Sequence, residues 1–367
     1  MSERIKVGIV GCGNISQAYF NGCRLFPILE VTACADLNEA AARKKAEENQ
    51  VRALTVAELM QDPDIQIVIN LTVPRVHAEI SLQALRAGKH VHSEKPLGVS
   101  LAEGRAVVEE AAARKLRAGC APDTFLGAGF QTCRKLVEDG WIGRPLAGTA
   151  FMMGRGPEGW HPNPAFFYEA GGGPMFDMGP YYLTALVHLL GPVKSVSAVT
   201  TRGFEERIAT CKEQMGRRLP VQVPTHYSGT LVFRDGAVVT VVVSFDVHRS
   251  AHRNIEVYGS DGSLQAPDPN TFGGPVSLFR PGSDDWMTST LTHGYRENSR
   301  GIGVADMAHA VRSGRPHRCD ARLALHVVEI MHAFEASSRT GQVRVLETTC
   351  ERPAPLPLGL LPGVLDD

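Results

Sequence analysis

Short apolar runs alternate with segments of helical periodicity along the first third of the chain. The apolar runs predict buried strands at residues 6–10, 31–35, 65–71 and 90–92. The periodic segments predict helices at residues 15–25, 37–49, 56–60, 77–87 and 101–114. Strands and helices that alternate at this spacing form βαβ units, which build a parallel sheet covered on both faces. The pattern therefore predicts a doubly wound α/β domain over residues 1–123.

The pattern changes after residue 123. A helix is expected at 130–139, and from about residue 145 the runs become longer and alternate between apolar and polar positions. Asp235-Gly236 suits a tight hairpin turn between arms at 227–233 and 237–245, and a further strand is expected at 254–258. Such alternation is typical of an antiparallel sheet with one open face.

Helical periodicity returns near the C-terminus, at 301–312 and 321–338. The segment from Glu351 is rich in proline and leucine, which favours an extended tail at 351–367. We therefore expect residues 124–350 to form an α+β domain with a large open, mostly antiparallel sheet.

Chain length, net charge and the lengths of the apolar runs argue against several classes of protein function. A chain of 367 residues suits two domains, and a net charge of -1 leaves no basic excess for binding a nucleic acid backbone. No apolar run approaches the roughly 20 residues that a membrane span needs. The N-terminus shows no secretion signal, so a cytoplasmic location is expected.

Cysteine and histidine spacing argues against a metal site. The eight cysteines are scattered without a Cys-x-x-Cys pair, which favours free thiols over disulfides or zinc ligands. His248 and His252 are four residues apart in a segment patterned as a strand, and His326 and His332 are six apart, on different faces of a helix. We expect no metal.

A glycine-rich turn joins the first strand to the first helix. Gly11-Cys-Gly13-Asn-Ile-Ser16 has the form Gly-x-Gly-x-x-Ser, in which Gly11 permits the tight turn and Gly13 lets the backbone approach a pyrophosphate. The helix expected from Ile15 offers free N–H groups to phosphates, so Asn14 and Ile15 are expected to contact the cofactor. The small Ser16 replaces the third glycine and still permits close packing of helix on strand.

Asp36 stands at the end of the second strand, 20 residues beyond Ser16. A carboxylate at this place hydrogen-bonds the adenosine ribose, and it repels a 2′-phosphate, so NAD is favoured as cofactor. Arg43 and Lys44 keep NADP possible. Asp36 has an alternative role as the cap of the following helix.

Glu94-Lys95-Pro96 follows the fourth strand. By chain position it lies outside the carboxyl ends of the parallel strands, where ligands bind in such folds. A lysine there can bond a substrate oxygen and stabilise a developing alkoxide. The alternative is a solvated loop.

Four segments together resemble the Gfo/Idh/MocA family, named for glucose-fructose oxidoreductase, inositol dehydrogenase and a rhizopine-catabolism protein. They are residues 11–16, Thr72-Val-Pro-Arg-Val-His77, residues 94–96, and Gly171-Gly-Gly-Pro-Met-Phe-Asp177-Met-Gly-Pro-Tyr181, in family order as far as about residue 345. The resemblance implies an NAD(P)-binding domain, then a domain that binds a small sugar or polyol. Its open sheet often mediates homodimers or homotetramers.

The resemblance also implies catalytic roles for Lys95, Asp177 and Tyr181. Many members carry histidine four residues after the aspartate, whereas this chain has Tyr181, as glucose-fructose oxidoreductase and dimeric dihydrodiol dehydrogenase do. We expect Tyr181 to be the general acid/base, with its pKa lowered by the Lys95 cation. Asp177 would bind a substrate hydroxyl. The alternatives are an aromatic packed beside Tyr182, and a helix-start cap at Asp177.

By resemblance, further residues line the cleft. On the cofactor side these are Thr72, Pro74, His77, Glu94, Lys95 and Pro96. His77 has the alternative of capping its own helix. In an aromatic and proline-rich loop we expect substrate contacts from Trp160, His161 and Tyr168, against the alternative of a rigid packed loop. Weaker candidates are Asp123, Thr124, His248 and Arg249.

These residues predict a dehydrogenase that interconverts a secondary alcohol and a ketone on a sugar-like substrate by hydride transfer. Two alternatives stay open. One is an enzyme that retains its NAD and oxidises a sugar transiently, for glycoside cleavage or coupled redox. The other is a regulator that binds NAD or sugar without catalysis.

Overall fold

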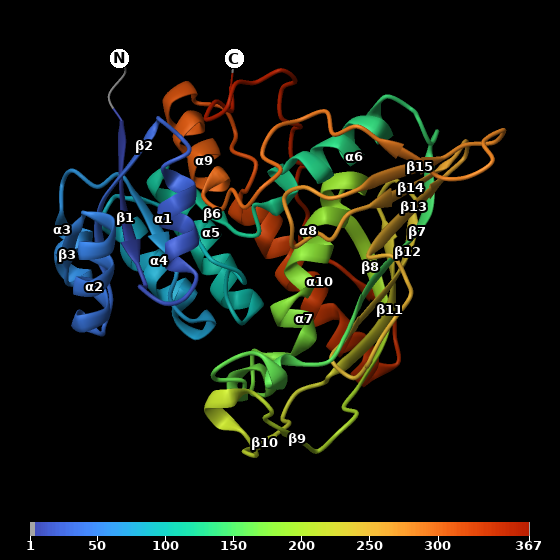
Figure 1. Cartoon of the computed structure of the whole chain (residues 1–367), viewed down its shortest axis with the longest axis horizontal. Helices are drawn as coiled ribbons and strands as arrows, with labels where there is room; N and C mark the ends of the chain where they lie inside the picture. Colours follow the sequence, from blue (N-terminus) through green and yellow to red (C-terminus); the bar gives the residue numbers. More distant parts are fainter. Residues whose placement is uncertain (1–3, 367) are drawn as a thin grey trace.

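The computed structural model describes residues 4–366. Met1, Ser2 and Glu3 of the expected first domain and Asp367 of the expected tail lie outside the described residues. Two sheets with their covering helices stand side by side, the parallel sheet on the left of Figure 1 and the larger sheet on the right. No helix within residues 4–366 is long and apolar enough to span a bilayer.

The first sheet is parallel throughout and has the strand order β3-β2-β1-β4-β5-β6. Its strands are β1 (Ile5–Val10), β2 (Leu29–Ala35), β3 (Arg52–Leu54), β4 (Ile67–Asn70), β5 (His90–Ser93) and β6 (Ala118–Cys120). Its helices are α1 (Ser16–Cys23), α2 (Glu39–Asn49), α3 (Val56–Gln61), α4 (His77–Arg86) and α5 (Leu101–Arg114). The order reverses between β1 and β4, which opens a crevice at their carboxyl ends. The doubly wound prediction is confirmed, although it omits the three-residue strands β3 and β6.

The second sheet has nine strands in the order β16-β15-β14-β13-β7-β12-β11-β8-β17, and only β7 and β12 pair in parallel. They are β7 (Pro145–Met153), β8 (Val193–Thr201), β11 (His226–Phe233), β12 (Val238–Ser244), β13 (Ile255–Gly259), β14 (Ser263–Ala266), β15 (Val276–Phe279), β16 (Met287–Ser289) and β17 (Arg344–Val345). The predicted hairpin is β11–β12, in which Val239, Val241 and Val243 are buried while Val238 and Thr240 are exposed. This alternation leaves one face open, as predicted.

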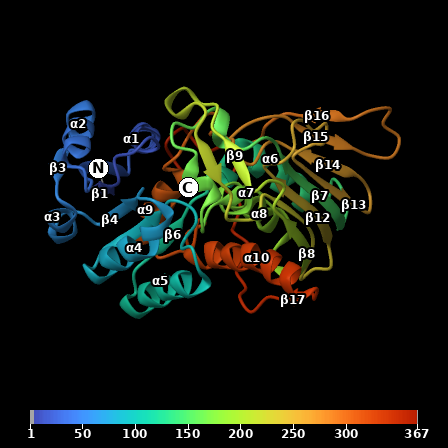
Figure 2. The same cartoon turned by 90° about the horizontal axis from the view of Figure 1, so that it is seen from below.

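Helices cover the buried face of this sheet: α6 (Ala128–Glu138), α7 (Gly173–Asp177), α8 (Gly179–Leu190) and α10 (Ala321–Thr340). Figure 2 shows α10 lying along β8 with α5 beside it, so α10 packs against both domains. After residue 345 the described chain forms no helix or strand, and Leu356 and Leu365 are buried where it crosses the surface.

The chain crosses between the domains a second time. Helix α9 (Ile302–Ser313) follows the large sheet but packs against α1 and β6 of the first domain. A Cβ at Gly22 in α1 would overlap the carbonyl oxygen of Arg300, so only glycine lets α1 lie this close to the segment that precedes α9. Asp123 accepts hydrogen bonds from the N–H groups of Gly301 (3.0 Å) and Gly303 (3.1 Å) at the start of α9. The predicted division into residues 1–123 and 124–350 does not include this return.

A small lobe, which we call the lower lobe, lies at the bottom of Figure 1, around the hairpin of β9 (Glu206–Ile208) and β10 (Arg218–Pro220). It has its own hydrophobic cluster, made by Phe167, Tyr168, Ala209, Cys211, Leu219, Val221 and Phe245. The sequence pattern does not predict this hairpin, because three-residue strands carry too little periodicity. All eight cysteines lie within the described residues and are free thiols, as expected.

Candidate active site

The glycine turn after β1 has the geometry that a dinucleotide requires. Gly11 has a φ of +104°, and a Cβ there would lie 2.5 Å from the carbonyl oxygen of Leu71. Gly13, in contrast, has no atom within 4 Å of the position of its missing Cβ, so its backbone borders open space. Helix α1 begins at Ser16 without a side-chain cap, and its Ser16 and Ala18 N–H groups donate to the Gly13 and Ile15 carbonyl oxygens. Within residues 4–366 the N–H groups of Asn14 and Ile15 have no acceptor, which leaves them for a ligand. The turn therefore fits a pyrophosphate.

Asp36 is turned toward this turn. Its Oδ2 accepts a hydrogen bond from the Cys12 N–H at 2.7 Å, and its Oδ1 accepts one from the Asn38 N–H at 2.8 Å. The cap of α2 is Asn38, whose side chain accepts from Ala40 and Ala41. The alternative role of Asp36 as that cap is therefore wrong. The half-buried carboxylate retains acceptor capacity for ribose hydroxyls.

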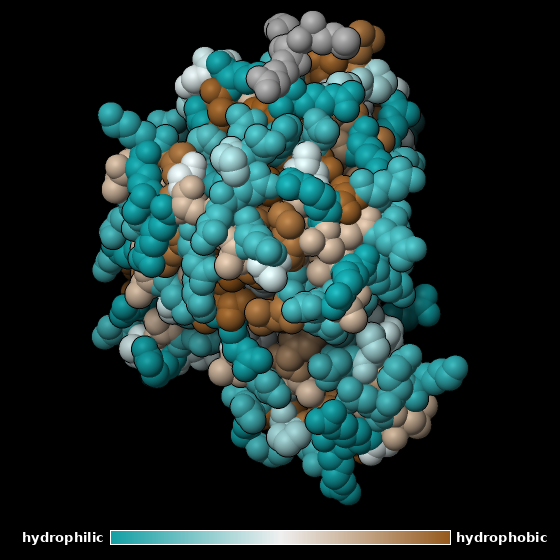
Figure 3. All heavy atoms as spheres, turned by 90° about the vertical axis from the view of Figure 1, so that its left-hand side faces the viewer, coloured by the Kyte–Doolittle hydropathy of each residue, from teal (hydrophilic) through white to brown (hydrophobic). Residues whose placement is uncertain are grey.

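A cavity of about 350 Å³ lies between the carboxyl ends of the parallel strands and the second domain. It gathers most of the predicted residues: Ile15, Thr72, Pro74, His77, Glu94, Lys95, Pro96, Trp160, His161, Asp177 and Tyr181. It is also lined by residues that sequence reasoning missed: Leu71, Phe166, Phe167, Gly171, Gly172 and Phe176. Hydrophobic residues gather in the middle of the face shown in Figure 3, above the lower lobe. Within the cavity wall Trp160 is 68% exposed and Phe166 is 40% exposed.

Two residues on the cofactor side have structural bonds as well. The buried ring of His77 lies with Nδ1 2.7 Å from the Pro96 carbonyl oxygen and Nε2 2.9 Å from that of Thr72. It ties the two loops of the cavity wall together, and burial lowers its pKa. Glu94 accepts a hydrogen bond from the Tyr19 hydroxyl at 2.8 Å, which fixes the carboxylate beside Lys95.

Lys95 and Asp177 form an ion pair in the cavity wall. The Lys95 Nζ donates to Asp177 Oδ1 at 2.9 Å and to the Asp177 carbonyl oxygen at 2.6 Å. The same Nζ lies 5.2 Å from the centre of the Tyr181 ring, over its face. Burial alone lowers the pKa of Lys95, but the charges of Asp177 and Tyr181 raise it above its usual value. The amine therefore stays charged at neutral pH.

Asp177 and Tyr181 do not share one continuous helix, although both line the cavity. Helix α7 ends at Asp177 and α8 begins at Gly179, with Met178 between them. The two side chains therefore meet in the cavity across a helix break.

The pKa of Tyr181 differs from the sequence expectation. Burial raises the pKa of this phenol above its usual value, and the positive charges of Lys95 and Arg300 offset only part of the rise. The expected net lowering by Lys95 is therefore wrong, because the cation lies over the ring face and the hydroxyl is desolvated. In this state the hydroxyl holds its proton at neutral pH.

Arg300, which sequence reasoning missed, approaches the Tyr181 hydroxyl. Its Nη2 lies 3.5 Å from that oxygen and 3.2 Å from Asn270 Oδ1. Arg300 precedes α9, so the return of the chain to the first domain brings this cation to the site. A separation of 119 residues from Tyr181 leaves no sequence pattern that could reveal the pair.

Several predicted contacts are not brought into the cavity. Tyr168 is fully buried in the hydrophobic cluster of the lower lobe and donates to the Glu158 carboxylate, so its prediction as a substrate contact is wrong. Asp123 caps α9, and the buried Thr124 hydroxyl donates to the Pro269 carbonyl oxygen at 2.7 Å. His248 and Arg249 are exposed and do not line the cavity.

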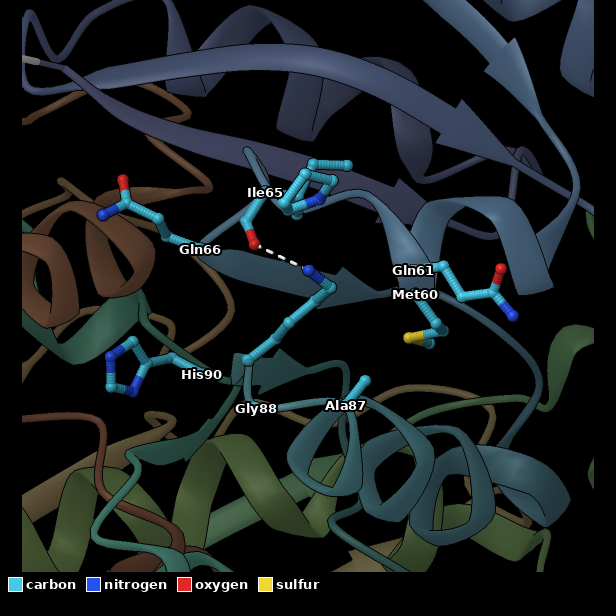
Figure 4. A pocket seen from close by; sticks show the side chains of 9 residues that line it. Met60, Gln61, Ile65, Gln66, Ala87, Gly88 and His90 are labelled. Carbon is cyan, nitrogen blue, oxygen red and sulfur yellow. Dashed lines mark hydrogen bonds between the residues drawn. The ribbon is translucent and has the colours of Figure 1, made fainter.

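A hollow of about 550 Å³ lies at the opposite edge of the parallel sheet. Figure 4 shows its wall between Met60, Ile65, Ala87 and His90, with the Lys89 Nζ donating to the Ile65 carbonyl oxygen at 2.9 Å. It borders the amino ends of β4 and β5, whereas ligands of such sheets bind at the carboxyl ends. Although this hollow is larger than the cavity beside Lys95, its wall has no carboxylate next to a cation, so we do not assign it as the catalytic site.

The parallel sheet with its glycine turn, and the lysine, aspartate and tyrosine beside it, define a nicotinamide-dependent oxidoreductase. Residues 5–121 match the model of an oxidoreductase family with an NAD-binding Rossmann fold, and residues 130–265 match the GFO/IDH/MocA C-terminal domain. The chain therefore belongs to the Gfo/Idh/MocA family of oxidoreductases, and it is an NAD(P)-dependent dehydrogenase.

Curated relatives resemble this chain over most of its length. It is 26% identical to levoglucosan dehydrogenase of Pseudarthrobacter phenanthrenivorans, over 71% of this chain and 73% of that protein. It is 24% identical to myo-inositol 2-dehydrogenase of Thermotoga maritima, over 71% and 75%.

Solved structures share the fold. One is an NAD binding oxidoreductase from Klebsiella pneumoniae, with a TM-score of 0.81 and 20% identity over 93% of this chain and 98% of that chain. Another is levoglucosan dehydrogenase in complex with NADH and L-sorbose, with a TM-score of 0.81 and 21% identity over 94% and 100%.

Proposed function

We propose that the protein interconverts a secondary alcohol and a ketone on a sugar-like or polyol substrate, with NAD as the hydride carrier. The meeting of Lys95, Asp177 and Tyr181 in one cavity with the cofactor-side residues carries this proposal. A sugar or polyol fits the exposed Trp160 and Phe166 rings, which pack against C–H faces, and the Asp177 carboxylate, which accepts from hydroxyls. The curated relatives are named for levoglucosan and inositol, which are such compounds.

When bound, NAD supplies the atom that accepts or gives the hydride. In oxidation, the Tyr181 phenolate takes the proton of the substrate hydroxyl, and the Lys95 ammonium stabilises the negative charge that develops on that oxygen. Asp177 holds Lys95 and accepts a hydrogen bond from a neighbouring hydroxyl. In reduction, neutral Tyr181 donates its proton to the ketone oxygen. Because the pKa of Tyr181 is raised, the neutral form that donates in reduction predominates at neutral pH, and the fraction of phenolate that oxidation uses increases with pH.

The experiment measures absorbance of reduced nicotinamide with purified protein, NAD or NADP, and a panel of sugars, inositols, sugar acids and trans-dihydrodiols. Turnover with one polyol class, lost in both Lys95→Ala and Tyr181→Phe, supports the proposal. Preference for NADP contradicts the role of Asp36. NAD binding without turnover favours the retained-cofactor enzyme or the non-catalytic regulator. Bound NAD that is reduced and reoxidised without release favours the retained-cofactor enzyme over the regulator.

We also infer a homodimer or homotetramer through the open face of the nine-stranded sheet. Pairing places Val199 and Val242 opposite Ser228, and Val238 opposite Val232, so these valines lie on one face. Val199 is 63% exposed and Val238 is 41% exposed, which leaves an apolar strip that a second copy would cover. Light scattering of the wild type and of Val199→Lys tests this, since a monomeric wild type contradicts it. The cytoplasmic location remains a prediction of the sequence.

A further inference from the structure

A second cavity adjoins the catalytic one in the lower lobe. Its volume is about 540 Å³, and Trp160 lines both cavities, so the two cavities meet at this residue. The other wall residues come from the loop before Trp160 and from the β9 hairpin, among them Arg155, Phe204 and Thr210. Because this cavity is larger than the catalytic one, it has room for a group as large as the reacting ring.

The floor of this second cavity is a buried ion network. Arg207 is 3% exposed and donates through Nε to Glu158 Oε1 at 2.9 Å and through Nη1 to Asp246 Oδ1 at 2.8 Å. Glu158 is 6% exposed and also accepts from the Tyr168 hydroxyl. Side chains held by several charge-assisted bonds give a rigid floor. This also explains the burial of Tyr168, which supports the second cavity instead of lining the first.

The rim of the second cavity is aromatic and has unused hydrogen-bond donors. Phe204 is 46% exposed, and the guanidinium carbons of Arg155 and Arg207 lie 5.8 Å and 5.0 Å from its ring centre. Among residues 4–366, the Arg155 guanidinium makes no hydrogen bond, and its nearest anion is Glu158 at 3.6 Å. Its donors are therefore available to a ligand.

The charges in this cavity balance. Arg155 and Arg207 are paired with the carboxylates of Glu158 and Asp246, and Glu206 is paired with Arg218. An anionic or cationic ligand therefore gains no net attraction. A neutral ring with many hydroxyls matches both features, because its C–H face packs on aromatic rings and its hydroxyls bond donors and acceptors. These are the properties of a sugar ring.

We propose that the second cavity is a subsite for the non-reacting sugar of a disaccharide or similar glycoside, whose reacting ring lies beside Lys95 and Tyr181. This inference rests on the proposed function. Trp160 contacts both rings at their junction. Binding energy from the remote ring positions the reacting ring, so removing that ring lowers kcat as well as raising KM.

The experiment compares glucose and methyl glucoside with maltose, cellobiose and trehalose. Kinetics use nicotinamide absorbance, and calorimetry on NADH-saturated protein, which cannot oxidise the sugar, measures sugar binding independently of turnover. At least one disaccharide should exceed the monosaccharides in affinity and in kcat/KM by about tenfold or more, the scale of one well-placed contact. Phe204→Ala and Arg155→Gln should each reduce that ratio toward one. Met215→Ala, at a 67% exposed residue of the same lobe, is the control and should leave the ratio unchanged.

The outcomes separate the two proposals. Equal affinity for monosaccharides and disaccharides overturns the subsite even if monosaccharides are oxidised. An unchanged ratio in both Phe204→Ala and Arg155→Gln, with both proteins folded, overturns it as well. Tighter disaccharide binding that both variants lose supports the subsite even without turnover, and in that case only the proposed reaction fails.

Discussion

The charge of Arg300 should set the pH at which Tyr181 becomes a base. Two unit charges at the 3.5 Å between Arg300 Nη2 and the Tyr181 oxygen interact by about 1 kcal/mol in bulk water and by about 5 kcal/mol at an effective dielectric constant of 20. A change of one in pKa corresponds to about 1.4 kcal/mol. Arg300→Gln should therefore raise the pKa of Tyr181 further, by about 1 to 3.5.

This rise should appear in the pH profile of kcat/KM, which reports the free enzyme. In oxidation the active form of Tyr181 is the phenolate, so its rising limb should move to higher pH. Below that limb, the oxidation rate at a fixed pH should fall about tenfold for each increase of one in the pKa of Tyr181. In reduction the neutral phenol is the active form, so the higher pKa in Arg300→Gln should not lower the reduction rate at neutral pH. Arg300→Lys, which keeps a positive charge, should return the limb part of the way toward its wild-type position.

The titration can also be measured without a substrate. Ultraviolet absorbance of phenolate, taken as the difference between a protein and its Tyr181→Phe counterpart, gives the Tyr181 titration directly. Arg296→Gln is the matched control, because Arg296 is exposed in the same loop and should leave the curve in place. Superimposable titrations of the wild type and Arg300→Gln would refute the reasoning.

Three further substitutions test the glycine turn and the lower lobe. Gly11→Ala should cost about 1–3 kcal/mol of unfolding free energy in urea titrations, because of the positive φ and the contact with Leu71. Gly13→Ala should leave stability within about 1 kcal/mol and weaken NAD binding at least about tenfold by calorimetry, since its Cβ enters open space at the pyrophosphate; unchanged affinity contradicts the cofactor role. Arg207→Met should lower the free energy of unfolding by about 3–5 kcal/mol, because it leaves the buried Glu158 carboxylate without its ion-pair partner. Burial alone raises the pKa of Glu158, but hydrogen bonds hold it below its usual value, so this stability is present at neutral pH and declines as acid protonates the carboxylate. If the unfolding free energy of the wild type, measured by urea titration, does not change as the pH is lowered, this role of Glu158 is contradicted.

The sequence pattern predicted those helices, strands and turns whose conformation depends on residues close together along the chain. The helix expected at 101–114 is α5 residue for residue, because Ser100 and Glu103 form a capping box at its start. The hairpin around Asp235-Gly236 and the glycine turn at Gly11 were likewise predictable, since backbone conformation at a turn restricts the residue type. Sequence order also placed Lys95 beside the cofactor cleft, because parallel strands bring their carboxyl ends to one edge.

Two properties of the site depended on the tertiary structure. Whether Tyr168 or Phe166 enters the cavity depends on which ring the Glu158–Arg207 network holds, and the composition of the loop is the same in either case. The direction in which the pKa of Tyr181 moves depends on how fully its hydroxyl is desolvated, which the identity of neighbouring residues does not give.

The sequence by itself determined the family, the parallel sheet and the cofactor turn, and it predicted the lysine, aspartate and tyrosine that we propose as catalytic residues. These follow from residues that are close along the chain or fixed by strand order. Only the tertiary structure brought Arg300 to the Tyr181 hydroxyl and set Trp160 where two cavities meet. Both contacts join segments that are far apart in sequence, and long-range packing leaves no periodicity along the chain from which they could be predicted.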